Sequence, residues 1–188
     1  MRRKAVFLDR DGVLNHSVIR DDGVSIPPPD AASMTMVEGA AGAVGRLKAA
    51  GFLCVCVTNQ PDVARGTRSV DNVAAMNEKA LREIPLDDLY VCMHDNADGC
   101  DCRKPKPGML LRAMEKWSID PSRSWMVGDR MSDIQAGVAA GCRTILVESG
   151  GRSKPVPGVT PDYVCQGIVE AAGAILAAGE PDAVRERV

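Results

Sequence analysis

Two aspartates near the start of the chain, Asp9 and Asp11, have the spacing of a paired-carboxylate site. In an extended segment, residues at i and i+2 point to the same side, and Gly12 then allows the chain to turn away. Two carboxylates about 4 Å apart repel each other by roughly 4 kcal/mol at an effective dielectric of about 20, and a cation bound between them removes that cost. The pair by itself is more typical of a solvated turn, so its meaning depends on what lies beside it in the fold.

Other polar residues follow further apolar segments. Residues 58–60, Thr-Asn-Gln, provide a hydroxyl and amides that can hold phosphate oxygens without adding negative charge. Arg103 and Lys104 are cations in a segment stiffened by prolines, and Asp129 follows a fourth apolar segment. Each of these features alone is equally compatible with an ordinary turn.

The segments that precede these residues are short, apolar and rich in β-branched side chains, which predicts strands. The expected strands are residues 4–9, 52–58, 89–94, 124–129, 144–148 and 162–165. Helical patterns alternate with them, which predicts an α/β fold with a single doubly wound, Rossmann-like parallel sheet of five or six strands and helices on both faces. Because ligands of such sheets bind beyond the carboxyl ends of the strands, the polar residues should converge on one site.

Apolar residues at i, i+4 and i+7 predict helices that pack one face on the sheet. Three sets have this spacing: Ala40, Val44 and Leu47; Leu110, Met114 and Trp117; and Ile134, Val138 and Gly141. Ser132, followed by Gln135, resembles a capping box at the start of the last of these helices. Residues 20–36 and 150–161 are rich in polar residues, Gly and Pro, and predict two long loops.

Composition narrows the class of protein. The 188 residues carry 23 basic and 25 acidic side chains, with 45% hydrophobic and 26% charged residues, which is typical of a soluble globular domain. We expect one domain over residues 1–178 and a flexible tail over 179–188. The net charge of −2 and the absence of a basic block disfavour a dedicated nucleic-acid binder.

The sequence also disfavours a membrane protein. The longest uninterrupted apolar run, residues 52–57, is far shorter than the roughly 18 to 20 residues that span a bilayer, and only four apolar residues follow the basic start. We expect no signal peptide, no membrane anchor and a cytoplasmic protein. The seven cysteines are then expected to be reduced thiols or metal ligands rather than disulfides.

Four segments resemble, in order, the motifs of the haloacid dehalogenase-like phosphatases. They are Asp9-Arg10-Asp11-Gly12, Thr58-Asn59-Gln60, Arg103-Lys104-Pro105 and Gly128-Asp129-x-x-x-Asp133. The match runs from about residue 5 to residue 148. Residues 7–15, 58–60 with 64–66, and 100–105 are similar to the branch that contains heptose 1,7-bisphosphate phosphatase and histidinol-phosphate phosphatase.

This resemblance implies a role for each carboxylate. Asp9 would attack phosphorus to form an aspartyl-phosphate, and Asp11 would protonate the leaving alkoxide and then activate water. Mg²⁺ would be bound by Asp9, the backbone carbonyl of Asp11 and Asp129. Asp133 would ligate the metal directly or act through a neighbouring group.

The resemblance also implies how phosphate is held. Lys104 would neutralise the nucleophile and the phosphoryl oxygens, which Thr58 and the backbone N–H of Asn59 would bind. Arg65 and Arg103 have the chemistry to hold a second, remote phosphate, although a surface salt bridge is an equally good explanation for Arg65. His16 is left unassigned, as a polar loop residue.

Three cysteines and one histidine form a compact motif: Cys92, His94, Cys100 and Cys102. Three soft thiolates and one imidazole suit tetrahedral Zn²⁺, and binding would order a loop rich in Gly and Asp. The alternative is a set of reduced residues in a surface loop. With four protein ligands the zinc would be structural, with no position left for water. Cys54 and Cys56 alternate in a buried strand and are expected in the core, as are Cys142 and Cys165.

Length limits how the substrate is selected. Only 46 residues separate Asp11 from Thr58 and 45 separate Thr58 from Lys104, which leaves no room for a separate cap domain. Specificity must then come from the loops at residues 16–36 and 92–102, with or without a neighbouring subunit.

Two substrate classes remain. Residues 64–66, 106–110 and 125–128 resemble the heptose enzymes, whereas the five residues between His94 and Cys100 resemble the histidinol-phosphate enzymes. Met93 departs from the pattern of the whole branch, and residues 61–62, Pro-Asp, depart from the heptose pattern. We expect a heptose 1,7-bisphosphate 7-phosphatase, with histidinol phosphate as the alternative substrate and a monomer or small homo-oligomer as the assembly. A non-catalytic, zinc-stabilised binding module is the second alternative.

Overall fold

A six-stranded parallel sheet forms the centre of the computed structural model, which describes residues 2–21, 25–148 and 154–178. The strands are β1 (Ala5–Leu8), β4 (Leu53–Asn59), β5 (Asp88–Cys92), β6 (Trp125–Gly128), β7 (Arg143–Val147) and β8 (Tyr163–Cys165). Their order is β5-β4-β1-β6-β7-β8, and every neighbouring pair is parallel. The predicted doubly wound sheet is therefore confirmed.

The strand order places a topological switch at β1. The chain goes from β1 to β4 and β5 on one side, and returns to β6, β7 and β8 on the other. Ligands of open α/β sheets bind beside such a switch, outside the carboxyl ends of the strands. The loops that follow β1, β4 and β6 meet at this place.

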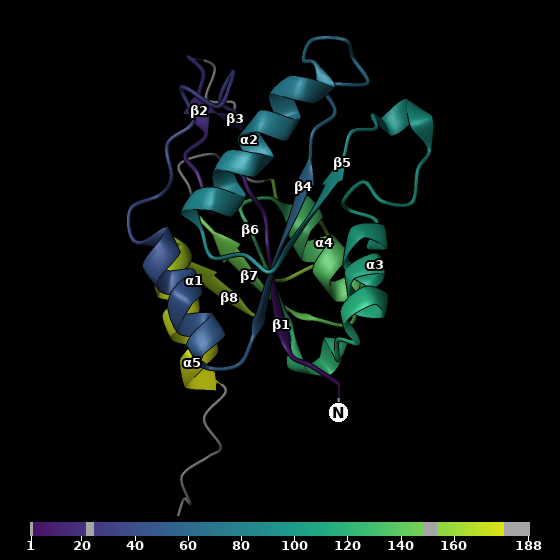
Figure 1. The fold of residues 1–188 in the computed structure, drawn as a ribbon. Coiled ribbons are helices and arrows are strands. Elements are labelled where there is room, and N and C mark those ends of the chain that lie inside the picture. The colour runs from purple at the N-terminus through teal and green to yellow at the C-terminus, as the bar shows by residue number, and fades with distance from the viewer. Residues whose placement is uncertain (1, 22–24, 149–153, 179–188) are drawn as a thin grey trace, which may run out of the picture.

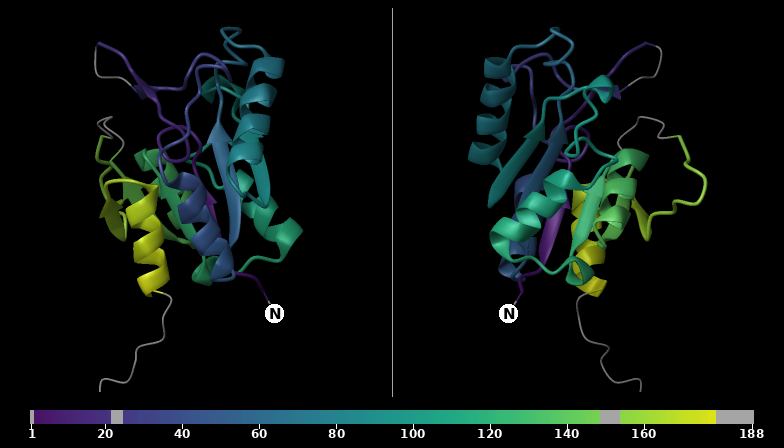
Figure 2. Two further views of the ribbon diagram at one scale, coloured as in Figure 1. Left: turned by 60° about the vertical axis from the view of Figure 1, so that its left-hand side comes forward. Right: turned by 90° about the vertical axis from the view of Figure 1, so that its right-hand side faces the viewer.

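Helices cover both faces of the sheet (Figure 1). They are α1 (Ala40–Ala49), α2 (Val70–Glu83), α3 (Gly108–Trp117), α4 (Met131–Ala139) and α5 (Ile168–Ala178). Helices α1 and α5 pack side by side on one face, and α3 and α4 pack on the other, as the two turned views in Figure 2 also show. Each face therefore has its own apolar core.

Alternation along β1 explains the two cores. Val6 and Leu8 pack towards α1 and α5, whereas Ala5 and Phe7 pack towards α3 and α4. Side chains of a strand alternate between the two faces of a sheet, so a strand buried on both faces has an unbroken apolar sequence. All four residues are fully buried.

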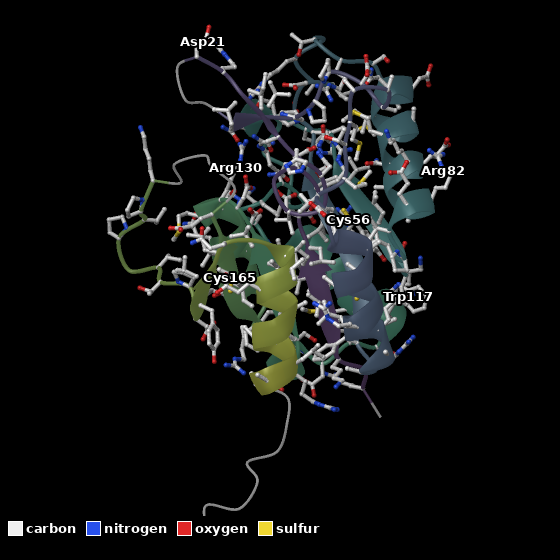
Figure 3. The ribbon with its side chains drawn as sticks, turned by 90° about the vertical axis from the view of Figure 1, so that its left-hand side faces the viewer. Asp21, Cys56, Arg82, Trp117, Arg130 and Cys165 are labelled. Carbon is white, nitrogen blue, oxygen red and sulfur yellow. The ribbon has the colours of Figure 1, made fainter. Side chains whose placement is uncertain are left out.

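The cysteines expected in the core lie there. Cys54 and Cys56 in β4 are fully buried, and Cys142 and Cys165 are nearly so. Figure 3, viewed from the side of α1 and α5, labels Cys56 and Cys165, which belong to the core beneath these helices. Burial raises the pKa of Cys54 and Cys56 to about 12, so both remain neutral thiols.

Helix α4 differs from its prediction in two ways. It begins at Met131, one residue before Ser132, and the backbone N–H of Arg130 donates to Asp133 Oδ2 at 3.0 Å, so Asp133 rather than Gln135 supports the first turn. Val138 is 53% exposed, so the predicted buried face is wrong at this position. The helix contacts the sheet through Gly137 instead.

A two-stranded antiparallel hairpin, β2 (Val18–Ile19) and β3 (Ser25–Ile26), lies in part of the chain predicted to be a loop. Its strands are too short to show a period in the sequence. In Figure 1 it stands beyond the carboxyl ends of the sheet strands. Residues 27–36 then pass over α2, where Lys79 Nζ donates to the carbonyls of Ala31 and Met34 at 2.9 and 2.6 Å.

No helix in the described ranges is long and apolar enough to cross a bilayer. The division into a domain over 1–178 and a tail over 179–188 stays a prediction, and residues 179–188 lie outside the described residues, as do residues 150–153 of the second expected loop.

Gly137 is a close contact of α4 with the sheet. A Cβ at this position would lie 2.7 Å from Met126 Cβ and 2.8 Å from Thr144 Cγ2. We expect Gly137→Ala to lower the free energy of unfolding by about 1–3 kcal/mol, because the neighbouring side chains must move. Gly42→Ala in α1 is the control: nothing lies within 4 Å of its Cβ, and the change should stabilise by about 0.5–1 kcal/mol. Denaturant unfolding measures both, and an unchanged stability for Gly137→Ala would contradict the packing.

Candidate active site

A cavity of about 440 Å³ opens at the carboxyl ends of the central strands. The predicted site residues that line it are Asp9, Asp11, Thr58, Asn59, Arg65, Arg103, Lys104 and Asp133. Ile26 and Pro27 from the β2–β3 hairpin and Asn96 from the cysteine loop line it too, so both loops expected to control specificity reach the cavity. Residues distant in sequence therefore share one site, as their positions after different strands predicted.

Lys104 is the central cation of this site. Its Nζ lies 2.9 Å from Asp9 Oδ1 and 2.7 Å from Asp133 Oδ1, and it donates to the carbonyl of Val57 at 2.7 Å. The lysine is only 3% exposed. Burial alone would lower the pKa of Lys104, but Asp133 and Asp9 outweigh it and raise the pKa, so the side chain is protonated.

Three carboxylates form a compact group next to Lys104. Asp9, Asp129 and Asp133 are all buried and offer one oxygen each within 4.8 Å of one another. Burial raises the pKa of Asp9 to about 7, with further contributions from Asp133 and Asp129, although Lys104 opposes the shift. Arg130 Nε lies 3.9 Å from Asp129 Oδ1, so two cations face three carboxylates, and hard oxygen donors in this arrangement suit a divalent cation such as Mg²⁺.

Gly128 makes room for this group. A Cβ on Gly128 would coincide with the side chain of Asp133. Because Asp133 lies in the first turn of α4, the close approach of β6 to this helix brings Asp133 beside Lys104. Arg130, labelled in Figure 3, directly follows Asp129 and lines the cavity.

Asp11 is held by a network that the sequence did not reveal. Arg10 Nη2 lies 2.9 Å from Asp11 Oδ2, Gln60 Nε2 donates to the same oxygen at 2.7 Å, and Asn15 Nδ2 donates to Oδ1 at 3.0 Å. Arg10 is fully buried and also donates to Asn77 of α2 at 2.7 Å. Arg10, Gln60 and Asn15 fix the orientation of Asp11 in the cavity, and Asn77 holds Arg10.

Gln60 corrects part of the sequence interpretation. We predicted that its amide helps to hold phosphate oxygens, but it is fully buried and donates to Asp11 and to Thr58 Oγ1, at 3.0 Å. Its position is therefore behind the cavity. Strand alternation places Gln60 on the same side as Thr58, and both Thr58 and Asn59 line the cavity, so the sequence pattern did not separate Gln60 from them.

Thr58 and Asn59 occupy the end of β4. Thr58 is nearly fully buried and lines the cavity with Asn59. The Asn59 side chain donates to the carbonyl of Lys104 at 2.9 Å and accepts from the backbone N–H of Lys104 at 3.1 Å. Asn59 thus orders the loop that carries the central lysine.

Arg65 and Arg103 line the cavity and also make ion pairs, so the salt bridge expected for Arg65 is present, and its role in binding phosphate stays a prediction. Arg65 donates to Asp95 at 2.8 and 2.9 Å, and its Nη1 lies 3.5 Å from Asp62. Arg103 donates to Asn96 at 2.8 Å. The paired Arg65 guanidinium lowers the pKa of Asp95 to about 2.

Cys92, His94, Cys100 and Cys102 lie together, with one donor atom from each within 4.8 Å of the others. Cys102 Sγ lies 3.2 Å from Cys92 Sγ, 3.5 Å from Cys100 Sγ and 3.3 Å from His94 Nδ1. A tetrahedral zinc with Zn–S bonds of about 2.3 Å separates its sulfur ligands by roughly 3.8 Å. The arrangement is therefore compatible with a zinc site.

The thiols in this cluster differ in pKa because their surroundings differ. Burial and hydrogen bonds to its neighbours raise the pKa of Cys92 to about 12. At Cys100 hydrogen bonds from backbone N–H groups outweigh burial and lower the pKa. The cluster therefore needs a cation to hold all three cysteines as thiolates.

His16 stays unassigned. It is exposed and lines a second, smaller cavity of about 260 Å³ with Ser17, Glu148 and Gln166. It is not among the residues that line the main cavity.

Comparison with known proteins agrees with this geometry. A family model described as "HAD-hyrolase-like" matches residues 101–171. The chain is 40% identical over 168 residues to the D-glycero-beta-D-manno-heptose-1,7-bisphosphate 7-phosphatase of Pasteurella multocida, covering 82% of this chain and 85% of the relative. It is 38% identical over 182 residues to the enzyme of the same name from Haemophilus influenzae, covering 89% and 94%.

A solved structure extends the comparison to the fold. The D,D-heptose 1,7-bisphosphate phosphatase from B. bronchiseptica, complexed with magnesium and phosphate, superposes with a TM-score of 0.78 at 30% identity. The match covers 93% of this chain and 99% of that one.

The fold and the cavity define a haloacid dehalogenase-like phosphatase. More particularly, the chain belongs to the family of haloacid dehalogenase-like phosphatases that includes these heptose bisphosphate phosphatases.

Proposed function

We propose that this protein is a Mg²⁺-dependent phosphatase that removes the 7-phosphate of D-glycero-D-manno-heptose 1,7-bisphosphate. The observation that carries the proposal is the 2.9 Å contact of Lys104 with Asp9 in a cavity that Asp11 and Thr58 also line. A nucleophile, a candidate acid and a phosphate-binding hydroxyl thus share one site. The relatives named above act on this class of substrate according to their names.

Magnesium would bind to Asp9, Asp129 and the backbone carbonyl of Asp11, with Asp133 as a direct or indirect partner. The oxygen-rich donor set and the excess negative charge support this assignment. When bound, Mg²⁺ supplies positive charge that offsets repulsion between the carboxylates and the phosphate dianion.

Asp9 is the proposed nucleophile. One carboxylate oxygen forms a bond to phosphorus while the bond from phosphorus to the sugar oxygen breaks, giving an aspartyl-phosphate. Asp11 gives its proton to the departing alkoxide, which otherwise leaves poorly. Lys104, Thr58 and the backbone N–H of Asn59 hold the phosphoryl oxygens during the transfer.

Water completes the cycle. Asp11, now a carboxylate, takes a proton from water as the water oxygen bonds to phosphorus. The bond between phosphorus and Asp9 then breaks, which releases inorganic phosphate and restores both carboxyl groups. The contacts of Asp11 with Arg10, Gln60 and Asn15 all come from donors, so they suit the carboxylate that takes a proton from water, and they hold this group in one orientation.

Arg65 and Arg103 are proposed to bind the phosphate that is not removed. Both line the cavity that contains Asp9, and guanidinium groups match phosphate oxygens in geometry and charge. The substrate is therefore a small bisphosphate. Histidinol phosphate is the alternative, which the five residues between His94 and Cys100 favour.

The cysteine and histidine cluster is proposed to bind a structural Zn²⁺. Arg103 directly follows Cys102 and Lys104 comes next, so a fixed cluster would fix both cations at the cavity. The assembly is proposed to be a monomer or small homo-oligomer in the cytoplasm.

Asp9→Asn should abolish turnover while the fold is retained, because an amide is not a nucleophile. We expect kcat with a sugar phosphate and Mg²⁺ to fall at least about a thousandfold. Phosphate release measures this, and Asp71→Asn, an exposed change in α2, is the control. Normal turnover by Asp9→Asn would remove Asp9 from the mechanism.

Substrate choice is tested by comparing heptose 1,7-bisphosphate with histidinol phosphate. We expect a higher kcat/KM for the bisphosphate, because only this substrate engages both arginines. A preference for histidinol phosphate of more than about tenfold would overturn the assignment. Absence of Mg²⁺-dependent phosphate release across a wide panel that includes p-nitrophenyl phosphate would favour a binding module.

Zinc content tests the proposed structural site. We expect about one Zn²⁺ per chain, and Cys100→Ser should lose it and unfold at a lower temperature. Cys142→Ala is the matched control, because Cys142 is buried but is not part of the cluster. Elemental analysis and thermal unfolding provide the readouts, and wild-type protein prepared with zinc but retaining none would refute the site.

A further inference from the structure

Asp95 lies in the short segment between two residues of the cysteine and histidine cluster, His94 and Cys100. Its carboxylate accepts two hydrogen bonds from Arg65, from Nε at 2.8 Å and from Nη2 at 2.9 Å. Such a bidentate pair fixes the plane of a guanidinium group as well as its position. Arg65 comes from the turn after β4, so the contact joins two separate loops.

The same carboxylate is close to a second arginine. Arg103 Nη2 lies 3.9 Å from Asp95 Oδ1, the oxygen that also accepts from Arg65 Nη2. Asn96 holds the Nε of Arg103 at 2.8 Å, and the carbonyl of His94 accepts from its Nη1 at 3.4 Å. Adjacent residues of one segment therefore orient both arginines.

Asp95 is itself held by a single turn of 3-10 helix, η1 (Asn96–Asp98). Its backbone N–H donates to Asp98 Oδ2 at 2.7 Å, and its Oδ1 accepts from the N–H of Asn96 at 2.8 Å. The carboxylate is thus placed by its backbone before it meets an arginine. It is therefore a fixed acceptor for the arginine side chains.

The position of Asp95 relative to the cavity shows whether it supports the two arginines or blocks their access to a phosphate. Arg65, Arg103 and Asn96 line the cavity, whereas Asp95 is not among the residues that line it in the described chain. The carboxylate therefore contacts the guanidinium groups from outside the cavity. It also offsets the repulsion between two cations that would otherwise separate.

Stability alone does not explain the arrangement. The side chain of Arg65 is 46% exposed, and exposed ion pairs contribute at most about 1 kcal/mol to folding. The geometric effect is separate from stability, because an arginine side chain has many rotamers and its two hydrogen bonds to Asp95, with the ion pair to Asp62 at 3.5 Å, favour one of them.

We propose that Asp95 is a positioning residue that holds Arg65 and Arg103 for the phosphate of the substrate that is not transferred. This inference rests on the proposed function. It assigns selectivity for bisphosphates to a carboxylate that does not touch the substrate.

The test is Asp95→Asn, which keeps the size of the side chain and removes its charge. We expect KM for heptose 1,7-bisphosphate to rise at least about tenfold, and kcat to change by less than about threefold, because one charge-assisted contact to phosphate is lost or misaligned. The ratio of kcat/KM for the bisphosphate to that for p-nitrophenyl phosphate should fall at least about tenfold, since the second substrate has no remote phosphate.

Two further variants complete the design. Asp101→Asn removes a similar ion pair, with Arg112 at 2.9 Å, from the same loop, and should keep the ratio within about twofold of wild type. Arg65→Ala combined with Asp95→Asn should raise KM by less than the product of the two single effects, because Asp95 acts through Arg65.

Three outcomes would overturn the inference. An unchanged ratio in Asp95→Asn, or an equal loss with both substrates, would leave Asp95 a purely structural residue. A lower KM would mean that Asp95 competes with phosphate for the arginines. Failure of the wild type to hydrolyse the bisphosphate faster than p-nitrophenyl phosphate would contradict both the proposed substrate and the inference. Because this result is seen in the wild type, it is distinguishable from a failure seen only in Asp95→Asn.

Discussion

The structure depends on one electrostatic constraint, the balance of buried negative charge around Lys104. Three buried carboxylates approach one another, from the ends of β1 and β6 and from the first turn of α4. Lys104 contacts two of them, and Arg130 Nε lies 3.9 Å from the third, Asp129. Charges of like sign cannot be brought together out of water unless cations compensate them. The loops around the cavity therefore carry cations. Lys104 lies in the loop after β5, and the Asn59 side chain holds the backbone of Lys104 through two hydrogen bonds.

One part of the cavity lining comes from the sheet, and the other part comes from loops. The sheet supplies Asp9 and Thr58 from strand ends, whose positions follow from backbone pairing, and Asp129 lies beside Asp9. The hairpin β2–β3 and the cysteine loop supply the opposite wall through Ile26, Asn96 and Arg103. A family that shares the first half can thus change its substrate by changing the second.

Several errors of sequence interpretation have the same physical origin. Gln60 was assigned to phosphate, but its partner Asp11 is distant in sequence. No role was predicted for Arg10, whose partner Asn77 lies on a helix far along the chain. Val138 has helical spacing with Ile134, yet it is exposed because the close approach of Gly137 to β6 sets the rotation of α4. The hairpin was missed because two-residue strands have no period.

The sequence by itself determined the strand and helix alternation, the parallel sheet, and the carboxylates and cations that follow its strands, because these depend on local patterns and on the rule that strand ends share one edge. Only the tertiary structure decided which donor meets which acceptor: Lys104 between Asp9 and Asp133, Asp11 among Arg10, Gln60 and Asn15, and the loop arginines on Asp95. Such pairs join segments far apart in the chain, and their distances follow from helix rotation and loop path, which no local pattern encodes.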